Sequence, residues 1–401
     1  MPELRAIPLT GSFQGRYSFA MHKVAIEKVA SYDPELVEIG LKNLLAPLGG
    51  IEAFVRPGER VLLKPNMLSA KPPEAAVTTH PAILSAVIRL VQDAGAVALV
   101  GDSPGFGSLR SVAKRSGMLA VVEECDAELV EFSETREVIS GGIFKRFEVA
   151  AAYLDADRVI NLPKLKTHEM MTLTCGVKNL FGILVGAAKP VWHLQAGFDR
   201  ELFARVLLEI YQIRPPDLTI VDAIMAMEGD GPGSGDPRQV GLLMAGANPV
   251  AIDLIAGEIA GIPKKLLFVE MEAKKLGLPG SDGEQIEIFG ADPAELQIPP
   301  FRLPPLSDVE FGLPRFIKNR LRKHLTTRPE QIPDRCLLCG VCVKGCPPGV
   351  IRIEGRNLRF DYDRCIRCFC CRELCPEAAL DVRKGILLRM FGGKKNIDSS
   401  G

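Results

Sequence analysis

Residues 336–347 read CLLCGVCVKGCP, and residues 365–376 read CIRCFCCRELCP. Both runs have the spacing C-x2-C-x2-C-x3-C-P. Three thiolates at this spacing can ligate three corners of one [4Fe–4S] cluster, while the fourth cysteine, which precedes a proline, ligates the cluster of the other run. The spacing therefore predicts two clusters in a small domain that folds around its metal.

The expected ligand sets cross between the two runs. Structural zinc also uses C-x2-C pairs, but two complete quartets with both prolines favour iron. Cys370 is an additional thiol that we expect to be a neighbour of the ligands. The expected sets are Cys336, Cys339, Cys342 and Cys375 for one cluster, and Cys365, Cys368, Cys371 and Cys346 for the other.

The stretch 331–384 resembles bacterial-type ferredoxin domains, which implies a small α+β fold with pseudo-twofold symmetry and one-electron transfer. A Pro-rich segment and a basic segment precede it. The basic segment is either a solvated helix or a docking surface for an acidic partner. The expected domains are an α/β domain over 1–310, a basic linker helix over 311–330, the ferredoxin-like domain over 331–384 and a flexible basic tail over 385–401.

The overall composition limits the classes of function. The 401 residues contain 49 Lys and Arg against 49 Asp and Glu, and only 6% are aromatic. A neutral chain with few aromatic residues is not typical of a nucleic-acid-binding protein, so no nucleic-acid partner is expected. The sequence predicts no transmembrane segment and no leader peptide. A cytoplasmic location, in a reducing compartment, is therefore expected, and clustered cysteines in such a compartment are metal ligands rather than disulfides.

Short apolar runs alternate with amphipathic stretches upstream of residue 292. This alternation predicts an α/β domain with a mostly parallel, doubly wound sheet. The stretch 24–50 has helical spacing. The expected strands are 61–63, 96–100, 129–132, 158–160, 218–221, 242–244 and 286–289, and the expected helices include 108–125, 174–184, 200–213 and 250–260.

Polar and ionisable side chains follow four of these strands. In an open parallel sheet, ligands bind beyond the carboxyl ends of the strands, so these side chains are expected to form one site. The segment 158–198 adds several basic residues with a single acid, Glu169, and therefore suits an anionic small molecule. The expected substrate-binding residues are Lys64, Asn66, Asp102, Ser103, Asn161, Lys164, Lys166 and Lys178.

Histidines and acids of the same segments are the expected catalytic residues. Histidine has an unperturbed pKa that suits proton delivery beside an electron donor. His168 and His193 would deliver protons, and Asp222 or Glu228 would orient them. A divalent cation held by Asp222, Glu228 and Asp230 is the alternative use of these carboxylates.

The large domain also resembles a known family. The strings LLKPNML, TTHPAIL, VGDSPG, VINLPKLKTH, GVKNLFG, KPVWH, TIVDAIMAMEGDGP and NPVAID occur in order over about 55–260. They are similar to domain-of-unknown-function family 362, which is often fused to a two-cluster ferredoxin module. The resemblance implies an α/β domain with iron–sulfur redox association, but it implies no reaction.

Three functions are consistent with these features. The first is a ferredoxin-type iron–sulfur oxidoreductase, a reductase that passes electrons from a redox partner protein through two clusters to an anionic small molecule at the sheet edge. The second is an electron-transfer subunit that docks on a partner reductase. The third is a non-redox transferase or ligase whose clusters are structural or sense oxygen.

Overall fold

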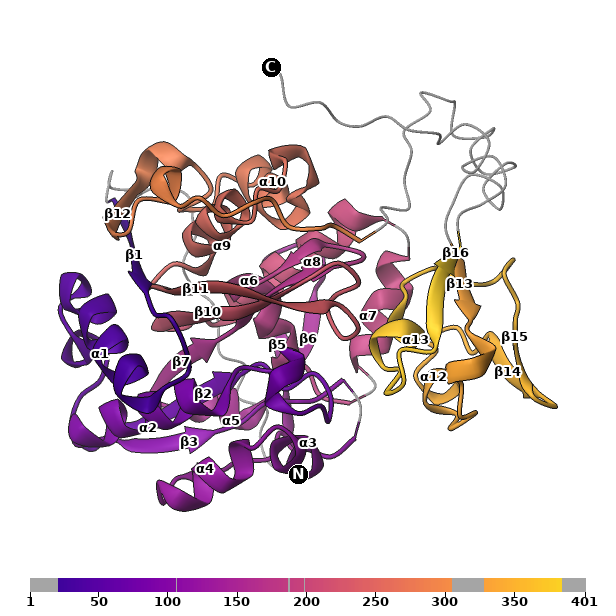
Figure 1. Ribbon diagram of the computed structural model, residues 1–401, viewed down its shortest axis with the longest axis horizontal. Coiled ribbons are helices and arrows are strands. Elements are labelled where there is room, and N and C mark those ends of the chain that lie inside the picture. The colour runs from indigo at the N-terminus through magenta and orange to yellow at the C-terminus, as the bar shows by residue number, and fades with distance from the viewer. Residues whose placement is uncertain (1–20, 106, 187, 198, 305–327, 384–401) are drawn as a thin grey trace.

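A large α/β body lies beside a smaller module in the computed structural model, which describes residues 21–105, 107–186, 188–197, 199–304 and 328–383 (Figure 1). A ten-stranded sheet forms the centre of the body, and its main path is β12-β1-β11-β10-β7-β2-β3-β4. The strands are β1 His22–Lys28, β2 Arg60–Pro65, β3 Val97–Val100, β4 Glu128–Leu129, β7 Arg158–Leu162, β8 Lys164–His168, β9 Thr172–Thr174, β10 Leu218–Glu228, β11 Asp236–Gly246 and β12 Ile286–Gly290.

Helices cover both faces of this sheet. Val61 and Leu63 of β2 pack in the core under one helical layer, whereas Leu62 packs in the core on the opposite face. Strands β10, β7, β2, β3 and β4 are parallel, so the predicted mostly parallel, doubly wound α/β fold is confirmed. One layer contains α1 Pro34–Leu45, α2 Pro81–Asp93, α3 Leu109–Arg115 and α4 Met118–Glu124, and the other contains α6 Gly176–Asn179, α8 Arg200–Ile213, α9 Pro249–Ile259 and α10 Phe268–Lys275.

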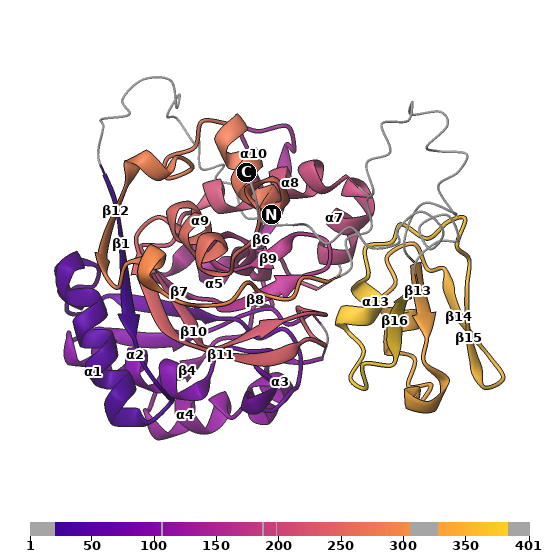
Figure 2. The same cartoon turned by 45° about the horizontal axis from the view of Figure 1, so that its top comes forward.

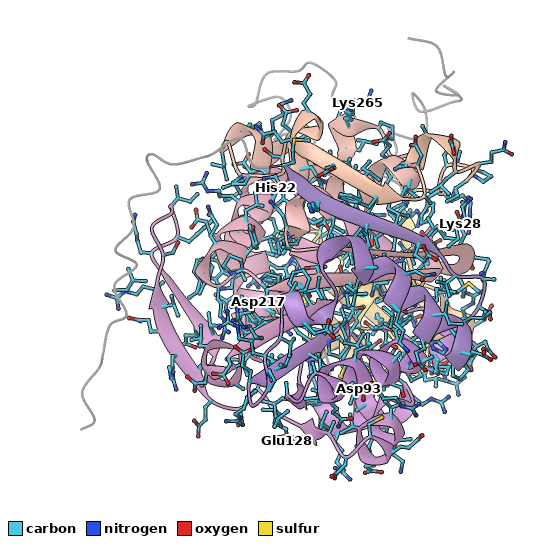
Figure 3. All side chains as sticks on the ribbon, turned by 90° about the vertical axis from the view of Figure 1, so that its left-hand side faces the viewer. His22, Lys28, Asp93, Glu128, Asp217 and Lys265 are labelled. Atoms are coloured by element: carbon cyan, nitrogen blue, oxygen red, sulfur yellow. The ribbon has the colours of Figure 1, made fainter. Side chains whose placement is uncertain are left out.

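Two segments differ from the sequence-based expectation. The start of the stretch 24–50 is not helical: β1 lies between β11 and β12, and its central residues are buried on both faces, so it lacks the alternation that marks a half-exposed strand. Figure 3 shows β1 between His22 and Lys28 on the side of the body turned away from the module. The stretch 161–174, where no strand was expected, forms the hairpin of β8 and β9, and β8 pairs with β10.

Shorter elements complete the body. Strands β5 Thr135–Ile139 and β6 Arg146–Ala150 form a separate hairpin, α5 Ala151–Asp155 follows it, and α7 Ala188–Ala196 precedes α8. The expected helix 174–184 is instead the end of β9, then α6, then a 3-10 turn over Leu180–Ile183. In the described ranges, no helix combines the length and the apolar character needed to cross a bilayer.

The small module consists of two antiparallel strand pairs and two short helices. Strand β13 Arg328–Gln331 pairs with β16 Leu380–Arg383, and β14 Ile351–Glu354 pairs with β15 Asn357–Phe360; the helices are α12 Val341–Lys344 and α13 Cys370–Glu373. Residues 328–330, which the linker-helix prediction included, are therefore strand. Residues 311–327 and the predicted tail lie outside the described residues. Helix α13 faces the body, while β14 and β15 lie on the far side (Figures 1 and 2).

A buried arginine joins the module to the body. The guanidinium of Arg372 lies 3.4 Å from a carboxylate oxygen of Glu169 and 2.6 Å from one of Asp230, and its side chain is only 5% exposed. A β-carbon on Gly233 would lie 2.7 Å from the carbonyl oxygen of Glu373, so only glycine permits this backbone approach. The sheet edge and α13 are thereby held in direct contact.

Candidate functional site

Eight cysteines of the module form two groups. Burial and three facing thiols raise the pKa of Cys342 to about 11, and these thiols belong to Cys375, Cys336 and Cys339. Burial and the thiols of Cys368, Cys365 and Cys346 likewise raise the pKa of Cys371. Each group combines three cysteines of one run with the last cysteine of the other run. This is the grouping that crossed ligation requires. We call Cys336, Cys339, Cys342 and Cys375 the outer quartet, and Cys346, Cys365, Cys368 and Cys371 the inner quartet.

The outer quartet surrounds a cavity that suits a cluster. Including its mouth, the cavity measures about 340 Å³, and it is lined by the four thiols together with Leu338, Leu358 and Leu380. Among the described residues, no three His, Cys, Asp or Glu side chains converge closely enough to hold one metal ion. Thiols spread around a cavity fit an iron–sulfur cluster, in which each sulfur ligates its own iron, better than a tetrahedral zinc ion.

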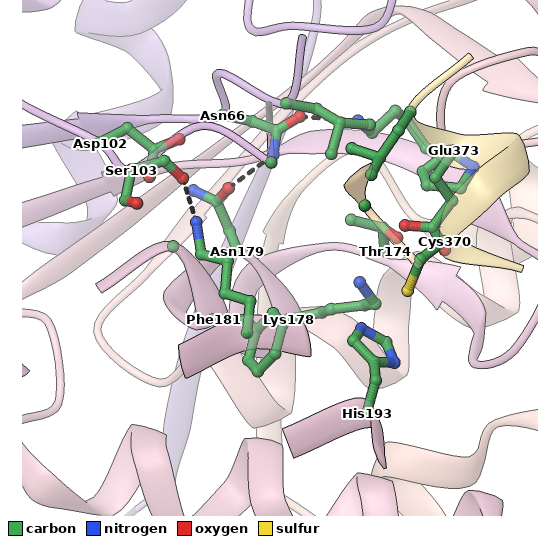
Figure 4. Close-up of a pocket in the computed structure, with 18 residues that line it drawn as sticks. Asn66, Asp102, Ser103, Thr174, Lys178, Asn179, Phe181, His193, Cys370 and Glu373 are labelled. Atoms are coloured by element: carbon green, nitrogen blue, oxygen red, sulfur yellow. Dashed lines mark hydrogen bonds between the residues drawn. The ribbon is translucent and has the colours of Figure 1, made fainter. Parts of the chain in front are cut away.

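A pocket lies between the sheet edge and the module (Figure 4). Including its mouth, it measures about 770 Å³. The body and the module both contribute to its walls. The polar lining consists of Asn66, Asp102, Ser103, Lys166, Thr174, Lys178, Asn179, Lys189 and His193 from the body, with Cys370 and Glu373 from α13; Leu68, Phe181 and Leu374 are apolar.

The ends of neighbouring strands place the first of these residues. Asn66 directly follows β2, Asp102 and Ser103 follow β3, and Lys166 lies on β8. The ammonium of Lys166 donates to the side-chain oxygen of Asn66 and to the carbonyl of Val77, both at 2.7 Å. Six of the twelve predicted site residues in the α/β domain therefore line one pocket: Asn66, Asp102, Ser103, Lys166, Lys178 and His193.

Two further predicted residues lie directly behind the lining. The ammonium of Lys64 is 2.7 Å from a carboxylate oxygen of Asp102, and both side chains are buried. The side-chain oxygen of Asn161 accepts a hydrogen bond from the amide of Asn179 at 2.8 Å. Lys64 and Asn161 thus position lining residues, and they do not face the pocket.

Lys164 and Asp222 form a separate buried network. The ammonium of Lys164 donates to Asp222 at 2.6 Å, to the hydroxyl of Tyr32 at 2.9 Å and to the carbonyl of Met225 at 3.0 Å. Tyr32 donates to Asp222 at 2.7 Å, and the backbone N–H of His80 donates to Asp222 at 2.8 Å. These partners satisfy both charged groups, so the structure gives Lys164 and Asp222 positions away from the pocket lining.

The remaining predicted carboxylates are also paired. Glu228 lies against the guanidinium groups of Arg238 and Arg302, and Asp230 pairs with Arg372. Asp222, Glu228 and Asp230 therefore each face a different cation. The described residues give no support to the alternative of a divalent cation held by these three, because their charges are already compensated and do not converge.

The pocket lining carries excess positive charge. Lys64 pairs with Asp102, and the lining then holds three lysines, Lys166, Lys178 and Lys189, against one further carboxylate, that of Glu373. Burial lowers the pKa of Lys178, and it lowers that of Lys189 to about 8. Burial, with Lys178 and Lys164 nearby, lowers the pKa of Lys166 well below its ordinary value. Buried cations without matching anions are costly, so this lining favours an anionic ligand.

His168 lies behind the lining and contacts Glu373. Its Nδ1 accepts hydrogen bonds from the backbone N–H groups of Met170 at 3.0 Å and Met171 at 3.2 Å, so the proton is on Nε2, which lies 3.2 Å from a carboxylate oxygen of Glu373. Burial lowers the pKa of His168 to about 4. Burial alone would raise the pKa of Glu373, but His168 and Lys178 outweigh it and lower the pKa to about 2. At neutral pH the pair is a neutral imidazole beside a carboxylate.

His193 lies deeper, between two aromatic rings. Its ring stacks on Phe203 at a centroid distance of 4.3 Å and meets Phe181 edge-on at 5.5 Å. Burial lowers the pKa of His193 to about 3, against the opposing charge of Glu373. Within the described part of the chain, neither Nδ1 of His193 nor the hydroxyl of Thr174 has a hydrogen-bonding partner, although both side chains are at least nine-tenths buried. The pocket therefore presents these two unsatisfied polar groups, whereas the lining oxygens of Asp102 and Glu373 that also lack a hydrogen bond lie beside Lys64 and His168.

The lowered pKa of His193 predicts a pH-dependent stability. The unfolded chain binds a proton near pH 6.5, whereas the folded chain does not until about pH 3. The free energy of unfolding is therefore expected to decrease as pH falls below 6.5, by about 1.4 kcal/mol per pH unit for this group. His193→Phe, which keeps a stacking ring, is expected to reduce the slope by nearly that amount at the pH 5 end of anaerobic urea titrations between pH 5 and 7, and by less toward pH 7. Equal slopes for both proteins would contradict the burial of a neutral histidine.

Several lining residues were not among the predicted site residues. Lys189 lies in the basic segment 158–198, and its ammonium contacts the carbonyl oxygen of Ser103. None of the predicted strands ends directly before Thr174, Asn179 or Phe181, so the rule of strand ends did not select them. Cys370 and Glu373 belong to the module, and their only signal was their position on either side of the expected ligand Cys371.

Comparisons with known proteins agree with this division. A family model described as a domain of unknown function (DUF362) matches residues 61–258, and a 4Fe-4S dicluster domain model matches residues 328–376. The thylakoid-associated protein sll1697 of Synechocystis sp. is 40% identical over 306 residues, which cover 76% of this chain and 95% of that protein. The lactate racemase apoprotein of Thermoanaerobacterium thermosaccharolyticum aligns with a TM-score of 0.40 at 11% identity, and the alignment covers 61% of this chain and 57% of the racemase. The dicluster match makes the module an iron–sulfur domain.

Proposed function

This chain belongs to the DUF362 family, and we propose that it is an iron–sulfur oxidoreductase that reduces an anionic small molecule in the pocket between its body and its module. One observation carries the proposal: helix α13 supplies the cluster ligand Cys371 and also the pocket residues Cys370 and Glu373. Cys370 lines the pocket, and the next residue along the chain is Cys371 of the inner quartet. A molecule bound in the pocket would therefore contact the residue next to a cluster ligand. The clusters, one for each quartet, supply one-electron transfer when bound.

The body supplies the recognition of the anion. Lys178 has no hydrogen-bonding partner among the described residues, and its ammonium lies 6.0 Å from the ring centre of Phe181. Figure 4 shows Lys178, His193 and Cys370 pointing toward one another in the pocket. An anionic group placed between Lys178 and Lys189 would satisfy both cations through charge-assisted hydrogen bonds.

Protons come from the same group of residues. Reduction adds negative charge to the bound molecule, and a buried ammonium with a lowered pKa is a competent donor near neutral pH. Lys189 fits this role because burial lowers its pKa to about 8, and burial also lowers the pKa of Lys178. His168, with its proton on Nε2, lies 3.2 Å from the carboxylate of Glu373.

The test begins with anaerobic purification and mass spectrometry of small molecules retained by the protein. We expect a retained anion, and we expect Lys178→Gln to weaken its binding by about tenfold or more, because one charge-assisted contact is lost. Lys344→Gln, which changes an exposed residue of helix α12, is the matched control. The anion should also reoxidise the reduced wild-type protein. An anion that binds both variants equally, or none at all, would instead favour the electron-transfer subunit.

A cytoplasmic location is part of the proposal, because a reducing compartment keeps thiol ligands available. The Synechocystis relative is described as thylakoid-associated. Peripheral attachment to a membrane surface is therefore the alternative. Fractionation of cells into soluble and membrane pools, with and without a high-salt wash, distinguishes the two.

A further inference from the structure

The two cysteine quartets differ in their surroundings. Cys368 and Cys371 of the inner quartet are each 6% exposed, and Cys371 lies on α13, which faces the body. In the outer quartet, Cys339 is exposed. The inner quartet is therefore adjacent to the pocket, and the outer quartet is the one open to solvent.

An apolar side chain covers the outer quartet on its solvent side. Leu337 lines the same cavity as the outer thiols and is 72% exposed, the highest value for a large apolar residue in the described part of the chain. Ile353 of β14 is also exposed, and its side chain approaches Gly340, which lines that cavity. We call Leu337, Cys339 and Ile353 the outer patch. Its apolar atoms lie where a second protein could exclude water above the cluster site.

Free positive charge is found on the elements around the outer patch. Arg359 pairs with Glu354 at 3.4 Å, so these two charges compensate each other. The remaining exposed cations on these elements have no ion-pair partner among the described residues, and they outnumber the exposed acids. Over residues 333–345, 351–360 and 375–381, the cations are Arg335, Lys344, Arg352 and Arg356, and the acids are Asp334, Glu377 and Asp381. This imbalance favours an acidic partner, because complementary charge accelerates association.

We infer that the outer patch is the docking site for a small acidic one-electron carrier protein of the ferredoxin or flavodoxin type. The inference rests on the proposed direction of electron flow. The carrier is oxidised by one electron at the outer patch and the outer cluster is reduced by one. The electron then passes to the inner cluster, beside the pocket. Two carriers thus supply the two electrons of a two-electron reduction, and the protons come from the pocket.

The test measures cluster reduction, without any substrate. Fully reduced flavodoxin, an acidic flavoprotein, is mixed anaerobically with the holoprotein, and the second-order rate constant is followed by absorbance. Leu337→Asp and Arg352→Glu are each expected to lower this rate constant about tenfold at low salt. Arg352 lies on β14, away from the cysteine runs, so it tests the patch even if a change beside Cys336 impairs cluster assembly.

Two controls make the result specific. Ile139→Asp changes a residue that is 57% exposed on β5 of the body, and it should leave the rate constant unchanged. Reduction by dithionite, which needs no protein docking, should be unchanged in Arg352→Glu. Equal rate constants for wild type, Leu337→Asp and Arg352→Glu would overturn the inference, and so would a wild-type rate constant that does not fall with added salt. Failure of the pocket to bind an anion would leave this measurement unaffected, so the two proposals fail separately.

Discussion

Cys375→Ala is expected to disrupt the cluster bound by the first cysteine run, although Cys375 belongs to the second run. The reason is the outer quartet, in which Cys375 faces Cys342 together with Cys336 and Cys339. With one cluster for each quartet, the wild-type protein should contain about eight irons per chain, and the variant should move toward about four. Iron and sulfide analysis of anaerobically purified protein measures this change, and the spectrum of the remaining cluster should match that of the inner quartet.

The matched control is Cys370→Ala. Cys370 lies in the same run and is buried, but it belongs to neither quartet and lines the pocket instead. Its removal should leave about eight irons per chain. If Cys370→Ala loses as much iron as Cys375→Ala, then the quartets are assigned incorrectly.

Lys164→Met is expected to destabilise the fold by about 3–5 kcal/mol, because it leaves the carboxylate of Asp222 buried without its cation. The Tyr32 hydroxyl and the His80 N–H remain as hydrogen-bond donors to Asp222, but neither carries the compensating charge. Urea unfolding, monitored by circular dichroism under anaerobic conditions, gives the change in the free energy of unfolding.

A second substitution separates a structural role from substrate binding. Lys164→Met combined with Asp222→Asn removes both charges and should recover much of the lost stability. Lys42→Met breaks the exposed pair with Glu38 and should have no measurable effect. If the single Lys164→Met variant is as stable as wild type yet loses the retained anion, Lys164 binds substrate and its pairing with Asp222 is incidental.

The sequence predicted the fold best where burial follows a regular period. In Arg200–Ile213 the apolar residues recur with helical spacing, and the predicted bounds of this helix agree with those of α8 in the structure. Strand β8 could not be found in this way. Lys164–His168 contains four polar residues in five, and all five are buried. Its burial depends on partners from distant segments, such as Tyr32 and Asn66, which a local pattern does not reveal.

The rule of strand carboxyl ends grouped the predicted residues but did not assign each residue its role. The rule placed Asn66, Asp102 and Lys166 in one group, and all three line one pocket. It could not distinguish Lys166, which lines the pocket, from Lys164, two residues earlier on the same strand, whose charge is compensated by Asp222. The difference depends on Tyr32, which contacts Lys164 and Asp222 but is far away from both in the sequence. The module's contribution to the pocket could not be predicted for the same reason, because it depends on tertiary contacts between module and body.

The four residues of helix α13 make different contacts or lie in different sites. Cys370 and Glu373 line the pocket, Cys371 belongs to the inner quartet, and Arg372 reaches Glu169 and Asp230 of the body. A module transplanted from another protein would supply the cysteine but not its neighbours. Such a chimera would therefore assemble its clusters normally and still lack one wall of the pocket. Residues 370–373 are the minimum that a functional chimera must retain from this module.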